Sequence, residues 1–272
     1  MLTTTIDGLW VLQILAGVET IAPELGLRAV LPRFETKEAA LAHPVAAELR
    51  QSGAIDDSGQ VDTAIVDWLT VLSRRDVALI FYINTPTDEG LIGVVLARFA
   101  QWWVSIERVQ SVVRIGPAGT ASTESSANTV IRDQIERLLG VLEPAPLRPV
   151  TLDADQIVDT VKNPESLGRF LGSQRVDADQ QRLLMLAADT SKSACASIVA
   201  AQAGAGKSHI EHGSVTIFDT PEGRILIEHA PQGGKLWMIA SPGSAGNIVT
   251  AINTMVRRLP AKEEWYSHRK IY

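Results

Sequence analysis

The chain has 272 residues, of which 46 % are hydrophobic and 21 % charged, a balance typical of a soluble globular protein with a sizeable core. Its net charge of −6 is spread along the sequence, and basic residues cluster only in short pairs such as Arg74-Arg75 and Arg257-Arg258. Nucleic acid is therefore not expected as a partner, because phosphate binding needs many clustered Lys and Arg side chains.

The N-terminal sequence and the single cysteine indicate the compartment. Residues 1–10 lack the basic start, apolar stretch and small-residue cleavage site of a signal peptide. No apolar run approaches the ~20 residues that a membrane-spanning helix needs. Cys195 has no second cysteine to pair with, and its apolar surroundings are typical of a buried structural thiol. We expect a cytoplasmic protein that does not insert into a membrane.

The first half of the chain is predicted to begin with helices and to continue with antiparallel strands. Segments with apolar residues at helical spacing or a good N-capping residue cover residues 9–18, 36–51, 62–71 and 123–141. Segments rich in β-branched and aromatic residues cover residues 77–83, 91–99, 102–109 and 112–115, after a short strand and turn at 3–8. Pro117 and Gly119 are expected to end the last of these strands.

Residues 143–150 hold three prolines and form the clearest linker in the chain. After this linker the order of elements is repeated. Helices are predicted at 154–162, 165–172, 177–188 and 247–258, with Asp153 and Asp177 as N-caps. Strands are predicted at 195–202, 214–219, 224–229 and 235–240.

Both halves thus run from helices through antiparallel strands and a Pro/Gly break to one amphipathic helix. Hairpins dominate and no βαβ alternation occurs, so we predict an α+β fold. We expect two similar halves, residues 1–143 and 144–272, related by an internal pseudo-twofold, each an antiparallel β-sheet covered by helices. The alternative is two unrelated α+β halves, because the repeat is one of pattern and not of sequence identity.

A glycine-rich segment ending in Gly206-Lys207-Ser208 resembles a P-loop. A P-loop runs from a strand straight into a helix, whose N-terminus holds the phosphates. Here Ser208 is followed by His-Ile-Glu-His-Gly and then by the strand predicted at 214–219, which favours a hairpin. We therefore expect no enzyme. A nucleotide-binding enzyme using Gly206-Lys207-Ser208 and a small-ligand sensor with a cavity between sheet and helices remain as alternatives.

Other polar clusters are better explained by structure than by chemistry. His209 and His212 lie in the glycine-rich loop without an evident third ligand for zinc. No catalytic residue, metal or cofactor is therefore expected. Trp102 and Trp103 are neighbours in a predicted strand, where side chains alternate between the two faces. One ring should lie in the core, and the other should be covered by a helix or exposed for a partner.

Several short motifs along nearly the whole chain resemble the EspG family of ESX (type VII) secretion-associated proteins, most closely its ESX-2 branch. The motifs are TIDGLWVLQ (5–13), APELGLR (22–28), HP (43–44), ELRxxG (48–53), LARFAQWWV (96–104) and LPxxxxW (259–265). The resemblance implies a fold of two similar α+β halves and a non-catalytic mycobacterial chaperone. Such a chaperone binds PE–PPE heterodimers, covers the hydrophobic tip of the PPE subunit and keeps its clients soluble for export.

The resemblance also implies where the client binds, namely the hairpin loop at residues 84–91 and the helices at about 166–186. The candidate contact residues in these two regions are Asn84, Thr85, Thr87, Asp88, Glu89, Leu91, Leu167, Phe170, Leu171 and Gln174. The sequence leaves open whether the apolar members on the helix contact a client or pack in the core. It also leaves open the identity of the client pair and weak self-association.

Overall fold

The structure, a computed structural model, describes residues 1–28, 30, 35–87, 90–203 and 208–267. The helices are α1 (Ile6–Ala16), α2 (Lys37–Ala42), α3 (Val45–Gln51), α4 (Thr63–Arg74), α5 (Glu124–Leu139), α6 (Ala154–Thr160), α7 (Pro164–Ser173), α8 (Ala178–Ala188) and α9 (Ala245–Val256), with short 3-10 helices η1 (Pro23–Leu25) and η2 (Lys262–Glu264). The strands are β1 (Leu2–Thr5), β2 (Val77–Asn84), β3 (Ile92–Phe99), β4 (Trp102–Val109), β5 (Val112–Thr120), β6 (Val150–Asp153), β7 (Ala194–Gln202), β8 (His209–Ile210), β9 (Ser214–Thr220), β10 (Gly223–Gln232) and β11 (Lys235–Pro242). Helices and antiparallel strands are mixed, which confirms the α+β class.

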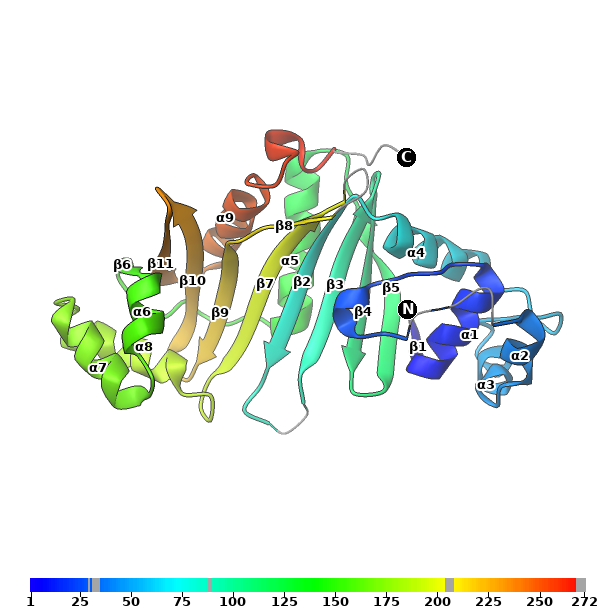
Figure 1. The fold of residues 1–272 in the computed structure, drawn as a ribbon, viewed down its shortest axis with the longest axis horizontal. Helices are drawn as coiled ribbons and strands as arrows, with labels where there is room; N and C mark the ends of the chain where they lie inside the picture. The colour runs from blue at the N-terminus through cyan, green and yellow to red at the C-terminus, as the bar shows by residue number, and fades with distance from the viewer. Residues whose placement is uncertain (29, 31–34, 88–89, 204–207, 268–272) are drawn as a thin grey trace.

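The strands form one continuous antiparallel sheet in the order β1-β5-β4-β3-β2-β7-β9-β10-β11-β6, with β8 paired to β7 (Figure 1). The two sheets expected from the sequence are joined because β2 pairs with β7 from Val77↔Gln202 to Asn84↔Cys195. The order β1-β5-β4-β3-β2 on one side of this junction matches β6-β11-β10-β9-β7 on the other. This shared connectivity is what an internal repeat predicts, and superposition of the two halves stays a prediction.

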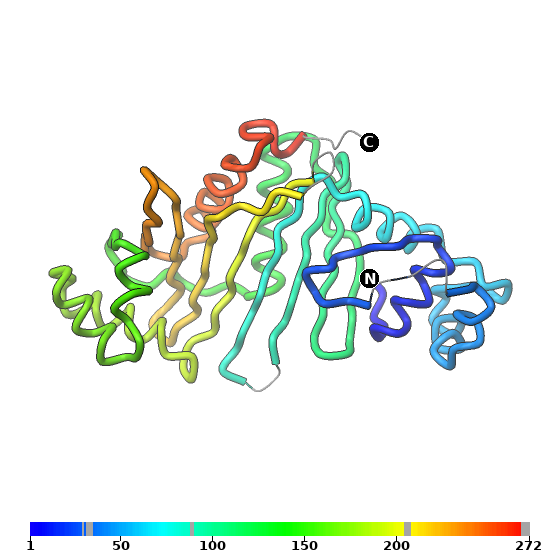
Figure 2. Tube along the Cα trace, viewed as in Figure 1, coloured from blue at the N-terminus to red at the C-terminus, as the bar shows by residue number. Residues whose placement is uncertain are grey.

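Helices lie on both faces of the sheet (Figures 1 and 2). Helices α5 and α9 cover one face, where Phe81 and Trp265 belong to the same buried cluster. On the other face, α1 and α4 pack over the first half and α6–α8 over the second. The alternation of β2 divides its side chains between the faces, so Leu79 and Phe81 lie beneath α5 and α9, whereas Ile80 faces the opposite side.

Two predicted elements that contain or adjoin a proline have other bounds in the structure, so these two predictions were wrong. The single helix expected over 36–51 is divided into α2 and α3, because the residue before a proline is disfavoured in the helical region and His43 is extended, with ψ of 137°. The strand β5 continues past Pro117 to Thr120. Strand β1 pairs only with Val112–Ile115 of β5. Pro117 lies beyond this pairing, so the N–H that proline lacks is not needed for a hydrogen bond to β1.

The linker predicted at 143–150 was partly wrong, because its last residue begins strand β6, which pairs with β11. The capping predictions are confirmed: Asp153 accepts from Gln156 N at the start of α6, and Asp177 accepts from Gln180 N at the start of α8. These caps fix the ends of the helices that lie over the second half of the sheet.

Candidate functional site

The β2–β3 loop and the end of α8 lie at the same edge of the sheet. In the β2–β7 ladder Asn84 pairs with Cys195, near the start of β7. Paired strands lie about 4.8 Å apart. The loop after Asn84 therefore leaves the sheet beside the turn at residues 189–193 that connects α8 to β7, and both lie at the lower edge in Figure 1. The β2–β3 loop is thus a neighbour of the turn that follows α8.

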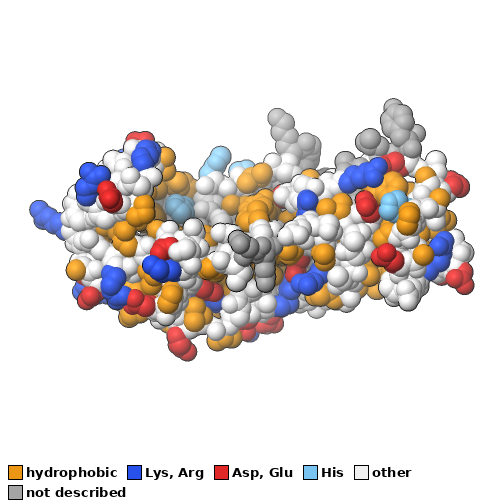
Figure 3. Space-filling model, turned by 90° about the horizontal axis from the view of Figure 1, so that it is seen from below, with side chains coloured by type: hydrophobic (Ala, Val, Ile, Leu, Met, Phe, Trp, Pro, Cys, Tyr) orange, Lys and Arg blue, Asp and Glu red, His pale blue; other side chains and the backbone are white. Residues whose placement is uncertain are grey.

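A groove of about 610 Å³ opens between α7, α8 and the 189–193 turn. Its apolar part includes the half-buried side chains of Leu167, Met185 and Leu186, and its charged rim consists of Arg182, Asp189, Lys192 and Glu222. Figure 3, which views the molecule from below, shows hydrophobic side chains lying between charged ones along this edge. An apolar centre with a polar rim is the arrangement typical of protein–protein interfaces.

The charges of the rim are paired with one another. Arg182 forms an ion pair with Glu222, and Lys192 Nζ lies 2.9 Å from Asp189 Oδ2. The Ser191 hydroxyl and then Lys192 stabilise the carboxylate of Asp189 and lower its pKa to about 2. The hydrogen bond that Arg182 donates to Glu222 raises the pKa of Arg182 above its ordinary value. The rim therefore keeps both signs of charge at neutral pH.

A second hollow, of about 410 Å³, lies beside the β2–β3 loop on the side of the first half. Leu91, which is 58 % exposed, lines it together with Tyr82 and Arg108. The Tyr82 hydroxyl donates to the Glu24 carbonyl at 3.2 Å, and Arg108 Nη1 donates to the Gly26 carbonyl at 2.8 Å. These bonds fix the η1 segment against the sheet, so an exposed apolar side chain stands beside a preformed hollow.

The residues predicted for client contact are divided by their burial. Those that face solvent fully or in part are Asn84, Thr85, Thr87, Leu91, Leu167 and Gln174. Phe170 and Leu171 are only 7 % and 1 % exposed and pack in the core cluster with Leu183 and Ile225. Asp88 and Glu89 lie outside the described residues. Leu167 of α7 lines the groove, whereas Gln174, the residue that follows α7, does not.

The P-loop-like segment does not have the geometry of a phosphate-binding loop where the structure describes it. Gly206 and Lys207 lie outside the described residues. Ser208 is followed by strand β8, in which His209 pairs with Gln202 of β7. A strand therefore stands where a P-loop requires the N-terminus of a helix.

The remaining titratable groups near this segment form structural contacts. Glu211 is buried, with its Oε1 2.9 Å from Arg258 Nε, and its Oε2 lies 3.9 Å from His209 Nε2. Within the described ranges, no group of three His, Cys, Asp or Glu side chains could hold a metal ion. Burial raises the pKa of the half-buried Cys195 thiol. No helix in the described part of the chain is long and apolar enough to cross a membrane.

Comparison with known proteins identifies the family. A model of the EspG family matches residues 5–254, nearly the whole chain. The chain belongs to the EspG family. It is 48 % identical to the ESX-2 secretion-associated protein EspG2 of Mycobacterium tuberculosis over the full length of both proteins. The ESX-5 secretion-associated protein EspG5 of the same organism is 23 % identical, with 99 % of this chain and 97 % of EspG5 covered. These identities confirm the ESX-2 branch.

A solved EspG structure has the same fold. The type VII secretion system chaperone EspG5 of Mycobacterium tuberculosis, in complex with a PE25–PPE41 dimer, matches with a TM-score of 0.79. The match covers 98 % of this chain and 99 % of EspG5 at 22 % sequence identity. The α+β architecture described above is therefore the EspG fold.

In this EspG protein the start of α7, which carries Leu167, is fixed by local contacts. Asn163 and Ser166 form a capping box, in which Ser166 N donates to Asn163 Oδ1 at 2.8 Å and Asn163 N donates to Ser166 Oγ at 3.0 Å. The cap fixes where the helix begins, and packing in the core cluster buries Phe170 while Leu167 lines the groove. Sequence reasoning missed Glu222 on the rim, because it lies in the turn between β9 and β10, far from α7 along the chain.

Proposed function

We propose that this EspG protein is a cytoplasmic, non-catalytic chaperone that binds PE–PPE heterodimers for export by an ESX-2 type VII secretion system. Its membership of the EspG family carries the proposal, since EspG5, which shares the fold, forms a complex with a PE25–PPE41 dimer. In this proposal the chaperone covers the hydrophobic tip of the PPE subunit and keeps the dimer soluble. Covering an exposed apolar patch removes a surface that would otherwise aggregate.

The client surface that we propose is the lower edge of the sheet in Figure 1. A standard protein interface buries about 800 Å² on each partner, more than the groove between α7 and α8 provides alone. The hollow beside Leu91 and the exposed residues of the β2–β3 loop extend the surface along the same edge. Leu91 and Leu167 serve as apolar anchors, and the paired charges of Arg182, Asp189, Lys192 and Glu222 select among clients.

Co-expression tests this proposal. The tagged chain is expressed together with each PE–PPE pair of a mycobacterial genome, and the soluble fraction is purified on the tag. We expect a small set of pairs to copurify with the chain and to be insoluble in its absence. If every pair were equally soluble with and without the chain and none copurified, the proposal would be wrong.

A further inference from the structure

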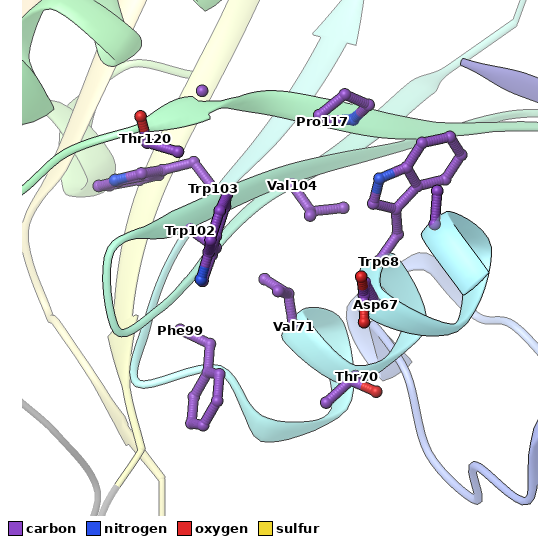
Figure 4. A pocket seen from close by; sticks show the side chains of 12 residues that line it. Asp67, Trp68, Thr70, Val71, Phe99, Trp102, Trp103, Val104, Pro117 and Thr120 are labelled. Atoms are coloured by element: carbon purple, nitrogen blue, oxygen red, sulfur yellow. The ribbon is translucent and has the colours of Figure 1, made fainter.

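An aromatic concavity lies at the other edge of the sheet, away from the proposed client surface. It is a pocket of about 520 Å³ between α4 and the turn that joins β3 to β4. Figure 4 shows Trp102 and Trp68 on opposite sides of the pocket, with Val71 and Val104 between them. Phe99 completes the aromatic lining. Trp102 is 53 % exposed, whereas its neighbour Trp103 is only 1 % exposed and packs on the opposite face.

The position of Trp102 indicates a binding role, because a structural role does not require it. Alternation along β4 directs Trp103 into the core beneath α5 and Trp102 to the other face. A large aromatic side chain left half in water at the mouth of an apolar pocket is the arrangement of an interface anchor, where Trp is among the most enriched residues. Trp68 on α4 is likewise only half buried and faces the same pocket.

The charge of the pocket specifies the chemistry of the ligand. Among the described residues that line it, Asp67 alone is charged, and its carboxylate forms no ion pair with another described residue. In Figure 4 Asp67 lies on the α4 side, between Trp68 and Val71. A carboxylate beside indole rings is complementary to a cation, which gains both an ion pair and a cation–π contact.

We propose that this pocket binds a partner protein through a segment that presents an arginine or lysine flanked by aliphatic side chains. The aliphatic residues pack on Val71, Val104 and Phe99, and the basic group lies between Asp67 and the indoles. The antiparallel register places Phe99 and Trp102 at one end of the β3–β4 pair and Ile92 at the other, next to the loop with Leu91. These ends are about 24 Å apart, because each residue of a strand advances the chain by about 3.4 Å. The pocket therefore stays accessible while a client occupies the lower edge.

Peptide titration tests the proposal on the full chain without any client. The probes are the capped pentapeptide Ala-Leu-Arg-Leu-Ala and two matched peptides in which Arg is replaced by citrulline, its neutral isostere, or by Glu. Binding is followed through the indole N–H resonances of Trp68 and Trp102, which are assigned with Trp68→Phe and Trp102→Phe variants. We expect saturable shifts with the Arg peptide, about fivefold weaker binding of the citrulline peptide, and the weakest binding of the Glu peptide.

Variants test the aromatic ring of Trp102 and the carboxylate of Asp67 separately. Trp102→Leu keeps an apolar cover and should weaken binding of the Arg peptide about tenfold, whereas Ile210→Ala, at an exposed site on β8, should leave it unchanged. Asp67→Lys should reverse the preference, so that the Glu peptide binds more tightly than the Arg peptide. Each variant must melt within about 2 °C of the wild type, so that a loss of binding is not a loss of folded protein.

Three outcomes would overturn the proposal. The first is equal binding of the Arg and citrulline peptides together with no effect of Asp67→Lys. The second is the absence of any saturable shift at Trp102. The third is self-association of the chain that Trp102→Leu abolishes, because the pocket would then be an interface between two copies. Reversal of the peptide preference by Asp67→Lys would establish the basic ligand.

Discussion

Arg98 of β3 and Asp76, the residue that precedes β2, form an ion pair to which solvent has no access, with 3.3 Å between Nη2 and Oδ2. Arg98 Nη1 also donates to the carbonyl of Trp265 at 2.8 Å, and Asp76 Oδ2 accepts from the backbone N–H of Ala100 at 3.0 Å. The pair therefore connects the first half of the sheet to the C-terminal segment, where Trp265 is fully buried.

The two members of this pair should be coupled, so that removing both costs less stability than the sum of removing each one alone. We expect Arg98→Met to lower the free energy of unfolding by about 3–5 kcal/mol, because it removes the buried guanidinium that forms the ion pair with Asp76. The double variant Asp76→Asn/Arg98→Met should lose clearly less than the sum of the two single variants. Urea unfolding of the four proteins measures this coupling, and strictly additive losses would contradict it.

Client binding should depend on the edge of the sheet at which an apolar side chain is replaced. Leu91 and Ile210 are both 58 % exposed but lie at opposite edges of the sheet, so they form a matched pair. Leu91→Asp should weaken binding of a copurifying PE–PPE pair at least about tenfold, which corresponds to ~1.4 kcal/mol. Ile210→Asp should leave the affinity unchanged. Calorimetric titration measures both, and an equal loss in the two variants would argue against the lower edge as the client surface.

The burial of His229 should make the protein sensitive to mild acid. Burial lowers the pKa of His229, whose Nδ1 lies 3.2 Å from Ser214 Oγ. The unfolded chain, with a histidine pKa of about 6.5, therefore takes up this proton more readily than the folded chain. The stability linked to His229 is fully present above the pKa of the unfolded chain. It is lost as the pH falls from there through the lower pKa of His229 in the folded chain. His229→Gln should lose less stability between pH 7.5 and 5, by at most about 1 kcal/mol because the ring is only partly buried.

Melting curves of the wild type and His229→Gln at pH 7.5, 6.5 and 5 measure this difference. As the solution becomes more acidic, the melting temperature of His229→Gln should fall less than that of the wild type. A difference in melting temperature between the two proteins that stays constant from pH 7.5 to 5 would mean that His229 does not titrate in this range.

The glycine-rich segment should have no nucleotide-dependent role, since a strand follows Ser208. Magnesium and ATP should leave the melting temperature of the wild type unchanged, and Lys207→Ala should melt at the same temperature and bind its client equally well. Saturable binding of ATP at micromolar concentration that disappears in Lys207→Ala would contradict this expectation.

Local signals in the sequence predicted most of the elements but not their assembly. Apolar spacing and N-caps such as Thr123 and Asp177 located α5 and α8, since these signals act within one helical turn. The β2–β7 pairing that joins the two sheets was missed, because it brings together residues more than 100 positions apart. The Asp76–Arg98 ion pair was missed for another reason, since neither residue stands out within its own segment.

The candidate site was predicted in outline and corrected in detail. The family resemblance indicated both the β2–β3 loop and the helices after the linker, and the β2–β7 register places the loop beside the turn that follows α8. The stripe of Leu167, Phe170 and Leu171 could not be divided between surface and core from spacing alone. Only the packing of α7 against α6 and α8 shows that Leu167 faces the groove while Phe170 is buried.

Hydrogen–deuterium exchange on the chain, free and bound to a copurifying PE–PPE pair, locates the client directly. We expect slower exchange in the complex at the amides of residues 84–91 and 164–192, where the loop and the groove lie on one edge. Exchange at residues 64–71 and 100–104, which surround the Trp102 pocket, should not change. Protection confined to those residues, or to the outer face of α5 and α9, would show that the client binds elsewhere.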